Sequence, residues 1–369
     1  MPMDQVFQPI GPRPAPARVN GRMAWLQQNL FATVPNAVAT LALLFLLGWL
    51  AVKGLQWGVL QAVYSPDADR CQAARGFGAC WGVVVEKGTF ILLGRYPQSQ
   101  SWRPLVATLC LLAPVLASCM PRCWKPWLPL GWLAGLAVFF VLMAGGVAGL
   151  SKVPTDQWGG LPLTILLSVV SMALAFPIAV LVALGRRSRM PAIRTLCVVY
   201  IELIRGVPLI SVLFMASFML PLLMPVGKSP DVLIRVVVGI TLFAAAYMAE
   251  IVRAGLQTIG TGQVEAAESI GLTWSQTQRK VVLPQALAAV VPSIMNNFIA
   301  LFKDTSLVTI VSLYELTGAL SLAVGSDPDW RPFKIEAYVF IAAIYFICCF
   351  AMSRYSLRVE RRLRRSGAR

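Results

Sequence analysis

Residues 264–271 read VEAAESIG, and a proline follows at position 284, where the next apolar run begins. The polar segment 256–285 that contains this stretch lies between two long apolar runs. Connections of this length inside a compact fold are usually functional or disordered. Because the segment is polar and marked by glycine in an otherwise apolar chain, it predicts a structured loop that a membrane protein presents to a partner.

The composition of the chain indicates lipid as its main solvent. Of its 369 residues 57% are hydrophobic and only 13% are charged, whereas soluble domains carry about 25% charged residues. We therefore predict an all-α, polytopic integral membrane protein. The net charge of +16 gathers in short segments between apolar runs and in the tail. No aromatic side chains interleave with it, so no nucleic-acid partner is expected.

Apolar windows of about 19 residues predict eight transmembrane helices. Lys and Arg gather before the first span, between spans two and three, four and five, and six and seven, and after the eighth. An even number of spans puts all these segments on one side, which the positive-inside rule makes cytoplasmic. Both termini and the segment 256–285 are then cytoplasmic. The predicted spans are 36–58, 104–120, 127–149, 160–184, 196–224, 232–254, 286–311 and 334–353.

The spans divide the chain into three regions by their character. The first region contains the cytoplasmic N-terminus, three spans and a long loop on the outer side. The second contains five spans with polar groups set into them and is the expected working core, while the basic cytoplasmic tail is expected to bind anionic lipid headgroups. These regions are residues 1–150 with the periplasmic loop 60–103, residues 156–355 with the loop 256–285, and residues 356–369.

The outer loop contains two features of its own. Cys71 and Cys80 lie together in a compartment that permits disulfides, and whether they form one stays open. The apolar segment from Trp81 to Leu93 is expected to pack against the membrane domain.

Five residues of the polar segment fit a short helix that another surface can approach: Glu265, Ala266, Ala267, Glu268 and Gly271. Ala267 and Gly271 are one turn apart, so we expect them on the same face. Glu265 and Glu268 are expected near the start of this helix, where its dipole favours acids. Leu283-Pro284 then begins the next span, since proline is tolerated in a first turn. An ordinary connector is the alternative.

This pattern, Glu265-Ala266-Ala267 with Gly271 and then Leu283-Pro284, resembles the coupling loop of bacterial ABC importer permeases. In that family the loop forms a short helix that docks on a cytoplasmic ATPase. The resemblance extends over residues 158–355, and the longer form of the chain, with its loop ending in Gly94-Arg95-Tyr96-Pro97, is similar to one membrane subunit of a general L-amino acid permease. The segments that resemble polar amino acid permeases are WGGLPLT (158–164), ELIRGVPL (202–209), AYMAEIVRAG (246–255) and FKDTSL (302–307).

The resemblance implies a type I ABC importer-like core of five helices, with three extra N-terminal spans, in the bacterial inner membrane. It implies a cytoplasmic ABC ATPase dimer that binds ATP and Mg and acts through residues 265–284. It also implies a second permease subunit, expected to be a different chain, and a periplasmic amino acid-binding protein. The chain itself is expected to have no cofactor, catalytic or metal site: it has no histidine, and Gly227-Lys228-Ser229 lacks the first glycine of a phosphate loop.

Ionisable residues inside the predicted spans are costly and indicate function. Two pairs lie three residues apart and can meet on one helix face: Glu202 with Arg205, and Glu250 with Arg253. They are either ion pairs that lock helices or contacts of the coupling loop. Lys303 and Asp304 are adjacent, so they point in different directions, and we expect them in or beside the translocation pathway.

Gly206 and Pro208 interrupt the fifth predicted span. Proline removes a backbone donor, and the freed carbonyls need partners in protein or in a water-filled cavity. Two alternatives follow. The freed backbone groups can line a site for an amino acid zwitterion, or the helix bends only to pack against its neighbours. The alternative function is an ion-coupled secondary transporter or channel that uses Glu202, Glu250 or Asp304. An enzyme or a scaffold protein is a weaker alternative.

Overall fold

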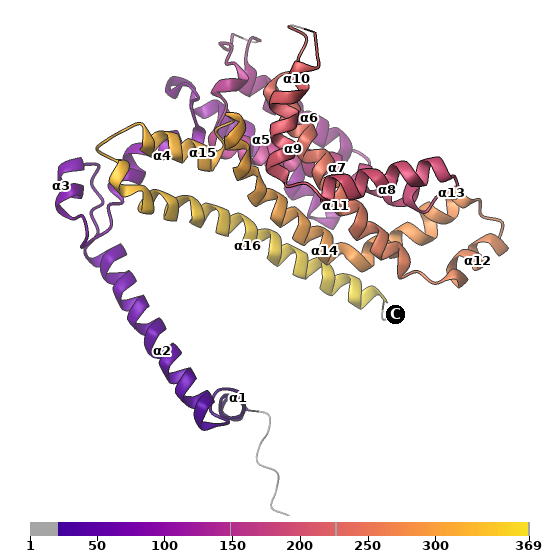
Figure 1. Cartoon of the computed structure of the whole chain (residues 1–369), viewed down its shortest axis with the longest axis horizontal. Coiled ribbons are helices and arrows are strands. Elements are labelled where there is room, and N and C mark those ends of the chain that lie inside the picture. Colours follow the sequence, from indigo (N-terminus) through magenta and orange to yellow (C-terminus); the bar gives the residue numbers. More distant parts are fainter. Residues whose placement is uncertain (1–20, 148, 226, 368–369) are drawn as a thin grey trace, which may run out of the picture. The chain divides into compact units, whose positions relative to one another are not determined.

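The computed structural model describes residues 21–147, 149–225 and 227–367. These residues are almost entirely helical (Figure 1) and form no β-sheet, only the isolated bridges Val63–Cys80 and Gly160–Glu315. The expectation of an all-α fold is confirmed. The chain divides into two compact units, Met1–Val63 with Arg70–Cys80 and Tyr64–Asp69 with Trp81–Arg369.

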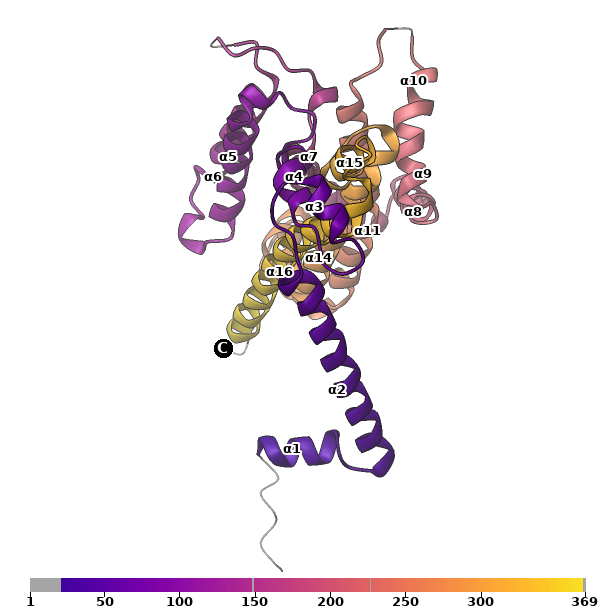
Figure 2. The ribbon, with the colours of Figure 1, turned by 90° about the vertical axis from the view of Figure 1, so that its left-hand side faces the viewer.

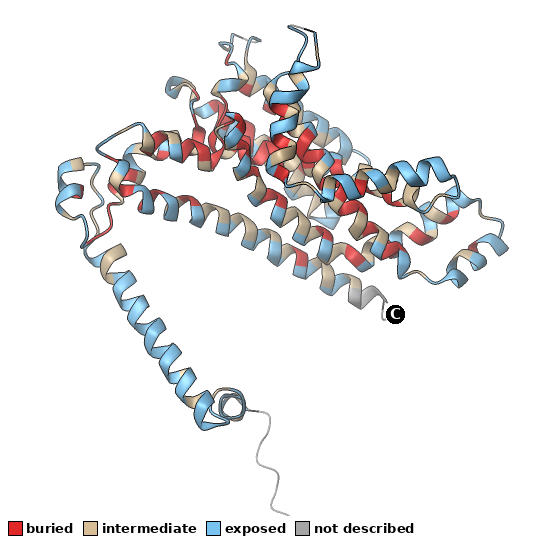
Figure 3. Cartoon of the chain, in the orientation of Figure 1, coloured by how far each residue is buried: buried red, intermediate tan, exposed pale blue. Residues whose placement is uncertain are grey.

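The first unit contains a long apolar helix with no protein core around it. Helix α1 (Arg22–Asn29) precedes α2 (Val34–Leu55), which continues into a π-helical turn (η1, Gln56–Leu60). Thr33 caps α2 by accepting a hydrogen bond from the backbone N–H of Asn36. No residue of α2 is buried, as Figure 3 shows. A helix that is apolar on every side is suited to lipid surroundings.

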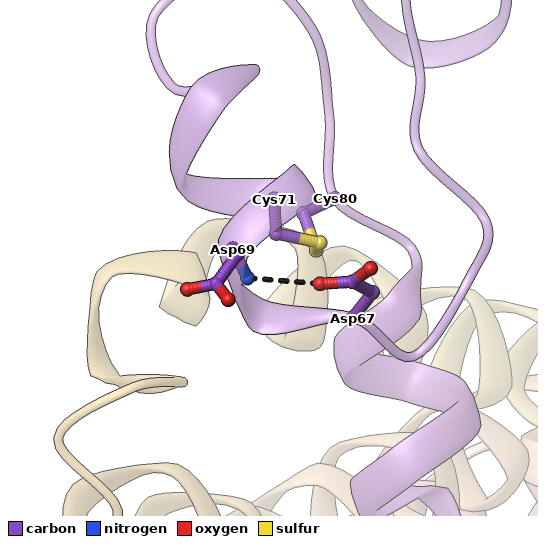
Figure 4. Close-up of a disulfide and its surroundings, with 4 residues drawn as sticks. All are labelled: Asp67, Asp69, Cys71 and Cys80. Carbon is purple, nitrogen blue, oxygen red and sulfur yellow. Dashed lines mark hydrogen bonds between the residues drawn. A yellow bond between two sulfur atoms is a disulfide. The ribbon is translucent and has the colours of Figure 1, made fainter.

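The same unit holds a disulfide between Cys71, in α3 (Ala68–Ala73), and Cys80. Both cysteines are fully buried, and the backbone of Val63 bonds to the carbonyl of Ala79 beside them. Figure 4 shows the two sulfur atoms joined. The question that the sequence left open is therefore settled in favour of the disulfide.

The second unit contains the remaining helices, with small residues at its centre. Helices α7 and α11 pack along each other, with α14 beside them, and buried alanines such as Ala179 and Ala245 let the backbones approach closely. Figure 3 shows this burial. The helices are α4 (Gly82–Leu93), α5 (Trp102–Ser118), α6 (Leu128–Ala144), α7 (Gly160–Arg186), α8 (Pro191–Arg205), α9 (Leu209–Phe214), α10 (Leu220–Leu222), α11 (Val232–Gln257), α12 (Thr261–Ser269), α13 (Trp274–Thr277), α14 (Leu283–Asp304), α15 (Leu316–Gly325) and α16 (Lys334–Gly367).

Short 3₁₀ or π-helical turns extend or join these helices. They are η2 (Gln98–Gln100), η3 (Pro121–Cys123), η4 (Thr155–Gln157), η5 (Met215–Met219), η6 (Gln278–Val282), η7 (Thr305–Val311) and η8 (Arg331–Phe333).

Within the described residues, six helical segments are long and apolar enough to cross a membrane. The predicted span 127–149 corresponds to α6, whose 17 residues lie at the short end of the range for crossing. The predicted count of eight is therefore not confirmed, while the polytopic helical fold is. The six segments are Val34–Leu60, Trp102–Cys119, Gly160–Arg186, Val232–Gln257, Trp274–Val311 and Arg331–Leu363.

The fifth predicted span, 196–224, is wrong as a single helix. It is broken between α8 and α9, which differ in direction by 105° (Figure 1). Pro208 disfavours helical geometry in the residue before it, and Gly206 ends α8 by donating its N–H to the carbonyl of Glu202. The interruption that the sequence predicted at Gly206 and Pro208 is a sharp break.

Helix α4 packs against α7 and α15, and α5 packs against α6 and α7 (Figure 2). A Cβ atom on Gly94, where φ is +69°, would come within 2.5 Å of the Gly159 Cα. Lys87 forms an ion pair of 2.8 Å with Asp327. The expected packing of Trp81–Leu93 is present. The division of the chain by character at residue 150 stays a prediction.

Candidate functional site

Helix α12 carries the predicted coupling residues. It starts at Thr261, and three residues separate it from the end of α11, so Glu265 lies in its middle and Glu268 in its last turn. The predicted place of these acids near the helix start is therefore wrong. Glu265, Ala266 and Glu268 are exposed, whereas Ala267 is buried against its own chain. Ala267 is then a packing residue, and its exposed neighbours form the accessible face.

Gly271 lies beyond the end of α12, so it does not share a helix face with Ala267 as predicted. Its N–H bonds to the carbonyl of Glu268, and the N–H of Leu272 bonds to the carbonyl of Ala267. This pair of bonds is a Schellman motif, whose C′ residue adopts left-handed geometry. Gly271 has φ +78° and open space around its Cα. Glycine is favoured here by backbone conformation.

A small apolar cluster joins α12 to the long helices. Val264 packs against buried residues from α7, α11, the turn η6 and α14. At the same level, a Cβ on Gly255 would meet the carbonyl oxygen of Ala286 at 2.5 Å, so α11 and α14 are nearly in backbone contact. Packed side chains therefore connect α12 with α7, α11 and α14. The buried members of the cluster are Ala183, Val252, Leu256, Val282 and Ala286.

Leu283 and Pro284 begin α14, with the proline in its first turn as expected. The helical segment as a whole begins earlier, at Trp274, because α13 and η6 lead directly into α14. The segment starts with a capping box in which Thr273 and Gln276 bond to each other's backbone. Gln278–Val282 then forms a π-helical turn directly before Pro284. Proline has no N–H to donate to the preceding turn, and the wider turn accommodates this loss.

Arg186, Glu202, Glu250 and Arg253 form an ion-pair cluster where α7, α8 and α11 meet. Glu250 accepts hydrogen bonds from Arg253 Nε at 3.0 and 2.9 Å, and from Arg186 Nη1 at 3.0 Å. Arg186 Nη2 also reaches Glu202 at 3.3 Å. The Glu250–Arg253 pair is confirmed. Through Arg186 the cluster links three helices, which favours the helix-locking alternative.

The predicted pair of Glu202 with Arg205 is wrong, because Glu202 bonds instead to Arg186. Arg205 stands over the ring of Tyr247 at 5.6 Å, a cation–π contact. The Tyr247 hydroxyl donates to the carbonyl of Arg205 at 3.5 Å, where α8 ends. The carbonyl freed by the helix break therefore has a protein partner.

Lys303 and Asp304 are the last two residues of α14, and neither side chain forms a hydrogen bond or ion pair within the described part of the chain. Lys303 is exposed and Asp304 is half-buried. Two charges in an apolar surrounding without such partners are available to a ligand or a second subunit. Their predicted place beside the pathway stays a prediction.

Comparison with known proteins identifies the chain. The sequence model of the binding-protein-dependent transport system inner membrane component matches residues 175–365. The chain belongs to this family. This permease is 45% identical to the inner membrane amino-acid ABC transporter permease protein YhdY of Escherichia coli, over 98% of both chains. The expected resemblance to ABC importer permeases is confirmed.

Two further relatives are similar to this permease. The glutamate/glutamine/aspartate/asparagine transport system permease protein BztC of Rhodobacter capsulatus is 35% identical over 96% of this chain and 97% of the relative. A solved amino acid ABC transporter with histidines is 31% identical over 55% of this chain and 92% of that one, with a TM-score of 0.48. The family and the relatives YhdY and BztC give no support to the alternative of an ion-coupled transporter or channel.

Two charged residues of this permease escaped the sequence reasoning. Arg186 belongs to a basic segment that orients the chain in the membrane. Its partners Glu250 and Glu202 are 64 and 16 residues away in the sequence, so helical spacing gives no signal of these ion pairs. Glu315 is fully buried, accepts backbone bonds from Thr317 and Gly318, and receives a hydroxyl bond of 2.9 Å from Tyr345. A lone acid directly before an apolar run is a signal for such a helix cap.

Proposed function

We propose that this permease subunit translocates amino acids across the bacterial inner membrane as part of an ABC importer. The names of its relatives support the substrate class, since YhdY is an amino-acid permease and BztC is named for four amino acids. The positive-inside rule supports cytoplasmic termini and a cytoplasmic α12. The multi-span membrane fold and the family support the inner membrane.

The observation that carries this proposal is that α12 has one exposed face while its other side packs against the long helices. Only residues 258–260 separate α12 from α11, and Val264 joins it to the apolar cluster. A cytoplasmic ATPase dimer that binds ATP and Mg contacts this face through Glu265, Ala266 and Glu268. ATP shifts the membrane helices because it stabilises one arrangement of the ATPase over the other. Leu283 and Pro284 pass this motion into α14.

The translocation pathway lies between this permease and a second, different permease subunit. Lys303 and Asp304 bind the charged groups of the amino acid, because they are the intramembrane pair that the described chain leaves without ion-pair partners. Glu202, Arg205, Gly206, Pro208, Glu250 and Arg253 shape the inner end of the pathway by fixing the junction of α8 with α9 and α11. A periplasmic amino acid-binding protein delivers the substrate.

The test is uptake by proteoliposomes that contain this permease with its co-expressed second permease and ATPase. We expect uptake of labelled amino acids that requires internal ATP and added binding protein. Uptake driven by an imposed proton or sodium gradient, without ATP, would support the ion-coupled alternative and overturn the proposal. An Asp304→Asn variant that keeps ATPase recovery but loses uptake would support the role of that residue.

A further inference from the structure

A basic cavity of about 650 Å³ opens beside the ion-pair cluster. Four arginines line it, and no described residue of its lining is acidic. The two carboxylates bound to the cluster, Glu202 and Glu250, offset only part of this charge: four positive and two negative groups leave a net charge of +2. The four arginines are Arg186, Arg187, Arg194 and Arg253.

Three of these guanidinium groups are held in place and one is free to engage a ligand. Glu250 fixes Arg186 and Arg253, and Arg187 donates to the carbonyl of Leu256 at 2.9 Å. Arg194 is exposed, and its side chain has no hydrogen bond or ion pair to another described residue. Guanidinium groups bind phosphate oxygens in a bidentate manner. The cavity is thus suited to a phosphate group.

The exposed surface of α8 indicates which kind of phosphate compound can reach the cavity. One face of α8 exposes a stripe of apolar side chains with helical spacing, and the residues Arg194 and Val198 turn toward the cavity. The helix has 15 residues, about 22 Å in length, which is less than a hydrocarbon core of about 30 Å. The apolar stripe consists of Ile193, Leu196, Val199 and Leu203, which are 40%, 70%, 54% and 60% exposed.

Because α8 bends by 105° from α9 (Figure 1), it does not continue as part of one straight span. A short amphipathic helix of this kind lies in the membrane interface with its apolar face toward the acyl chains. The cavity then stands at the level of the lipid headgroups. We propose that it binds the phosphate of an anionic phospholipid, and that this lipid fastens α8 beside the base of the coupling helix.

The test of this site measures lipid binding directly, so it needs no uptake measurement. The full-length permease, purified with its co-expressed partners, is equilibrated with mixed micelles of phosphatidylcholine and phosphatidylglycerol. Native mass spectrometry counts the retained phosphatidylglycerol. Arg194→Gln removes the free guanidinium, and Val198→Glu adds a carboxylate to the lining. Arg189→Gln removes the same charge from an exposed residue just before α8 that does not line the cavity.

We expect Arg194→Gln to weaken phosphatidylglycerol binding about fivefold and Val198→Glu to weaken it more, with unchanged elution volume and thermal stability. Arg189→Gln is expected to bind as the unaltered chain does. Equal losses in Arg194→Gln and Arg189→Gln would overturn the site. Displacement of the lipid by millimolar pyrophosphate would assign the cavity to a soluble phosphate compound. Unchanged lipid binding with loss of the co-purified ATPase would assign it to a protein contact.

Discussion

Among the single side chains, Glu250 has the largest structural role in the charged cluster. Replacing it by Gln leaves Arg186 with Glu202 alone and leaves Arg253 without its carboxylate partner. Hydrogen bonds to charged groups contribute about 1.5–3 kcal/mol each when partly buried, so we expect Glu250→Gln to lower the free energy of unfolding by about 2 kcal/mol. Thermal unfolding of the purified complex in detergent measures this loss.

Glu202→Gln is the matched control, because it removes a similar charge from the same cluster. The Glu202 side chain is 58% exposed, and its contact with Arg186 is 3.3 Å. Exposed ion pairs contribute about 0–1 kcal/mol, so its midpoint should hardly move. Equal destabilisation by both substitutions would show that Glu250 does not hold the three helices together.

Gly271 permits a second prediction, on the coupling of ATP hydrolysis to transport. Its φ of +78° strains most residues that carry a Cβ, by about 1 kcal/mol or more. We expect Gly271→Ala and Gly271→Glu to raise ATP hydrolysis per transported molecule, because the end of α12 loses its fixed geometry. Gly271→Asn is the control, since asparagine tolerates this conformation. Equal uncoupling by Asn would instead indicate that a small side chain is needed for contact.

The sequence could predict that charges lie inside the spans, but not which of them meet. A spacing of three residues correctly predicted the Glu250–Arg253 pair and failed for Glu202. Two residues on one helix face can form an ion pair, but a charged side chain on a neighbouring helix can bind one of them instead. Arg186 reaches Glu202 from α7. The same limit applies to Gly271, where the motif marked the residue and only the backbone angle explained it.

At the level of helices, Gly255 controls how closely α11 and α14 approach at the base of α12. A Cβ there would lie 2.5 Å from the Ala286 carbonyl oxygen, which is backbone and cannot move aside alone. We expect Gly255→Ala to lower the thermal midpoint of the complex and to reduce uptake. Gly48→Ala in α2 is the control, because a Cβ added at Gly48 would meet no atom from outside its own stretch of helix within 4 Å. An unchanged midpoint for Gly255→Ala would contradict the close packing.

The contact between α4 and the loop after α15 should depend on acid pH. Lys87 holds the pKa of Asp327 below its usual range through a hydrogen-bonded ion pair. A lowered folded-state pKa gives stability that is present above the usual value of about 3.9 and is lost as the pH falls through the folded-state pKa. Asp327→Asn should therefore lower the thermal midpoint near neutral pH. The midpoint of this variant should then fall less as the pH is lowered than that of the unaltered chain.

Asp156→Asn is the control for this titration, because Asp156 is exposed and forms no ion pair within the described chain. Melting curves from neutral pH to about pH 3 cover the range where aspartates titrate. The same acid profile for the unaltered chain and Asp327→Asn would show that the Lys87 pair contributes nothing.

Apolar windows located the helices well, because length and hydropathy are properties of one segment. They could not show that residues 196–224 turn by 105°. Gly206 and Pro208 indicated an interruption of the helix. Whether the helix bends or breaks there depends on how the two halves pack against the surrounding helices, which the sequence does not show. Helix α15 was also missed, since ten residues are too few for a span.

For the whole molecule, we expect the helices on the two sides of residue 150 to stay together even when the chain is cut there. Helices α4 and α5 pack on α7, so residues on both sides of that boundary belong to one compact unit. Gly149 is exposed, and a Cβ added there would meet nothing within 4 Å. A protease site inserted after Gly149 would therefore cut the chain without touching this packing. We expect the two fragments to co-purify after cleavage, as measured by size-exclusion chromatography in detergent.

Two glycines distinguish packing from backbone strain in this cleaved chain. Gly94 and Gly146 both have positive φ, +69° and +82°, so valine strains the backbone at each. Only Gly94 is in close contact with the other fragment, at Gly159, whereas Gly146 has open space. Gly94→Val should therefore separate the fragments and Gly146→Val should not. Separation in the unaltered chain would show that the packing of α4 and α5 on α7 does not hold the two fragments together.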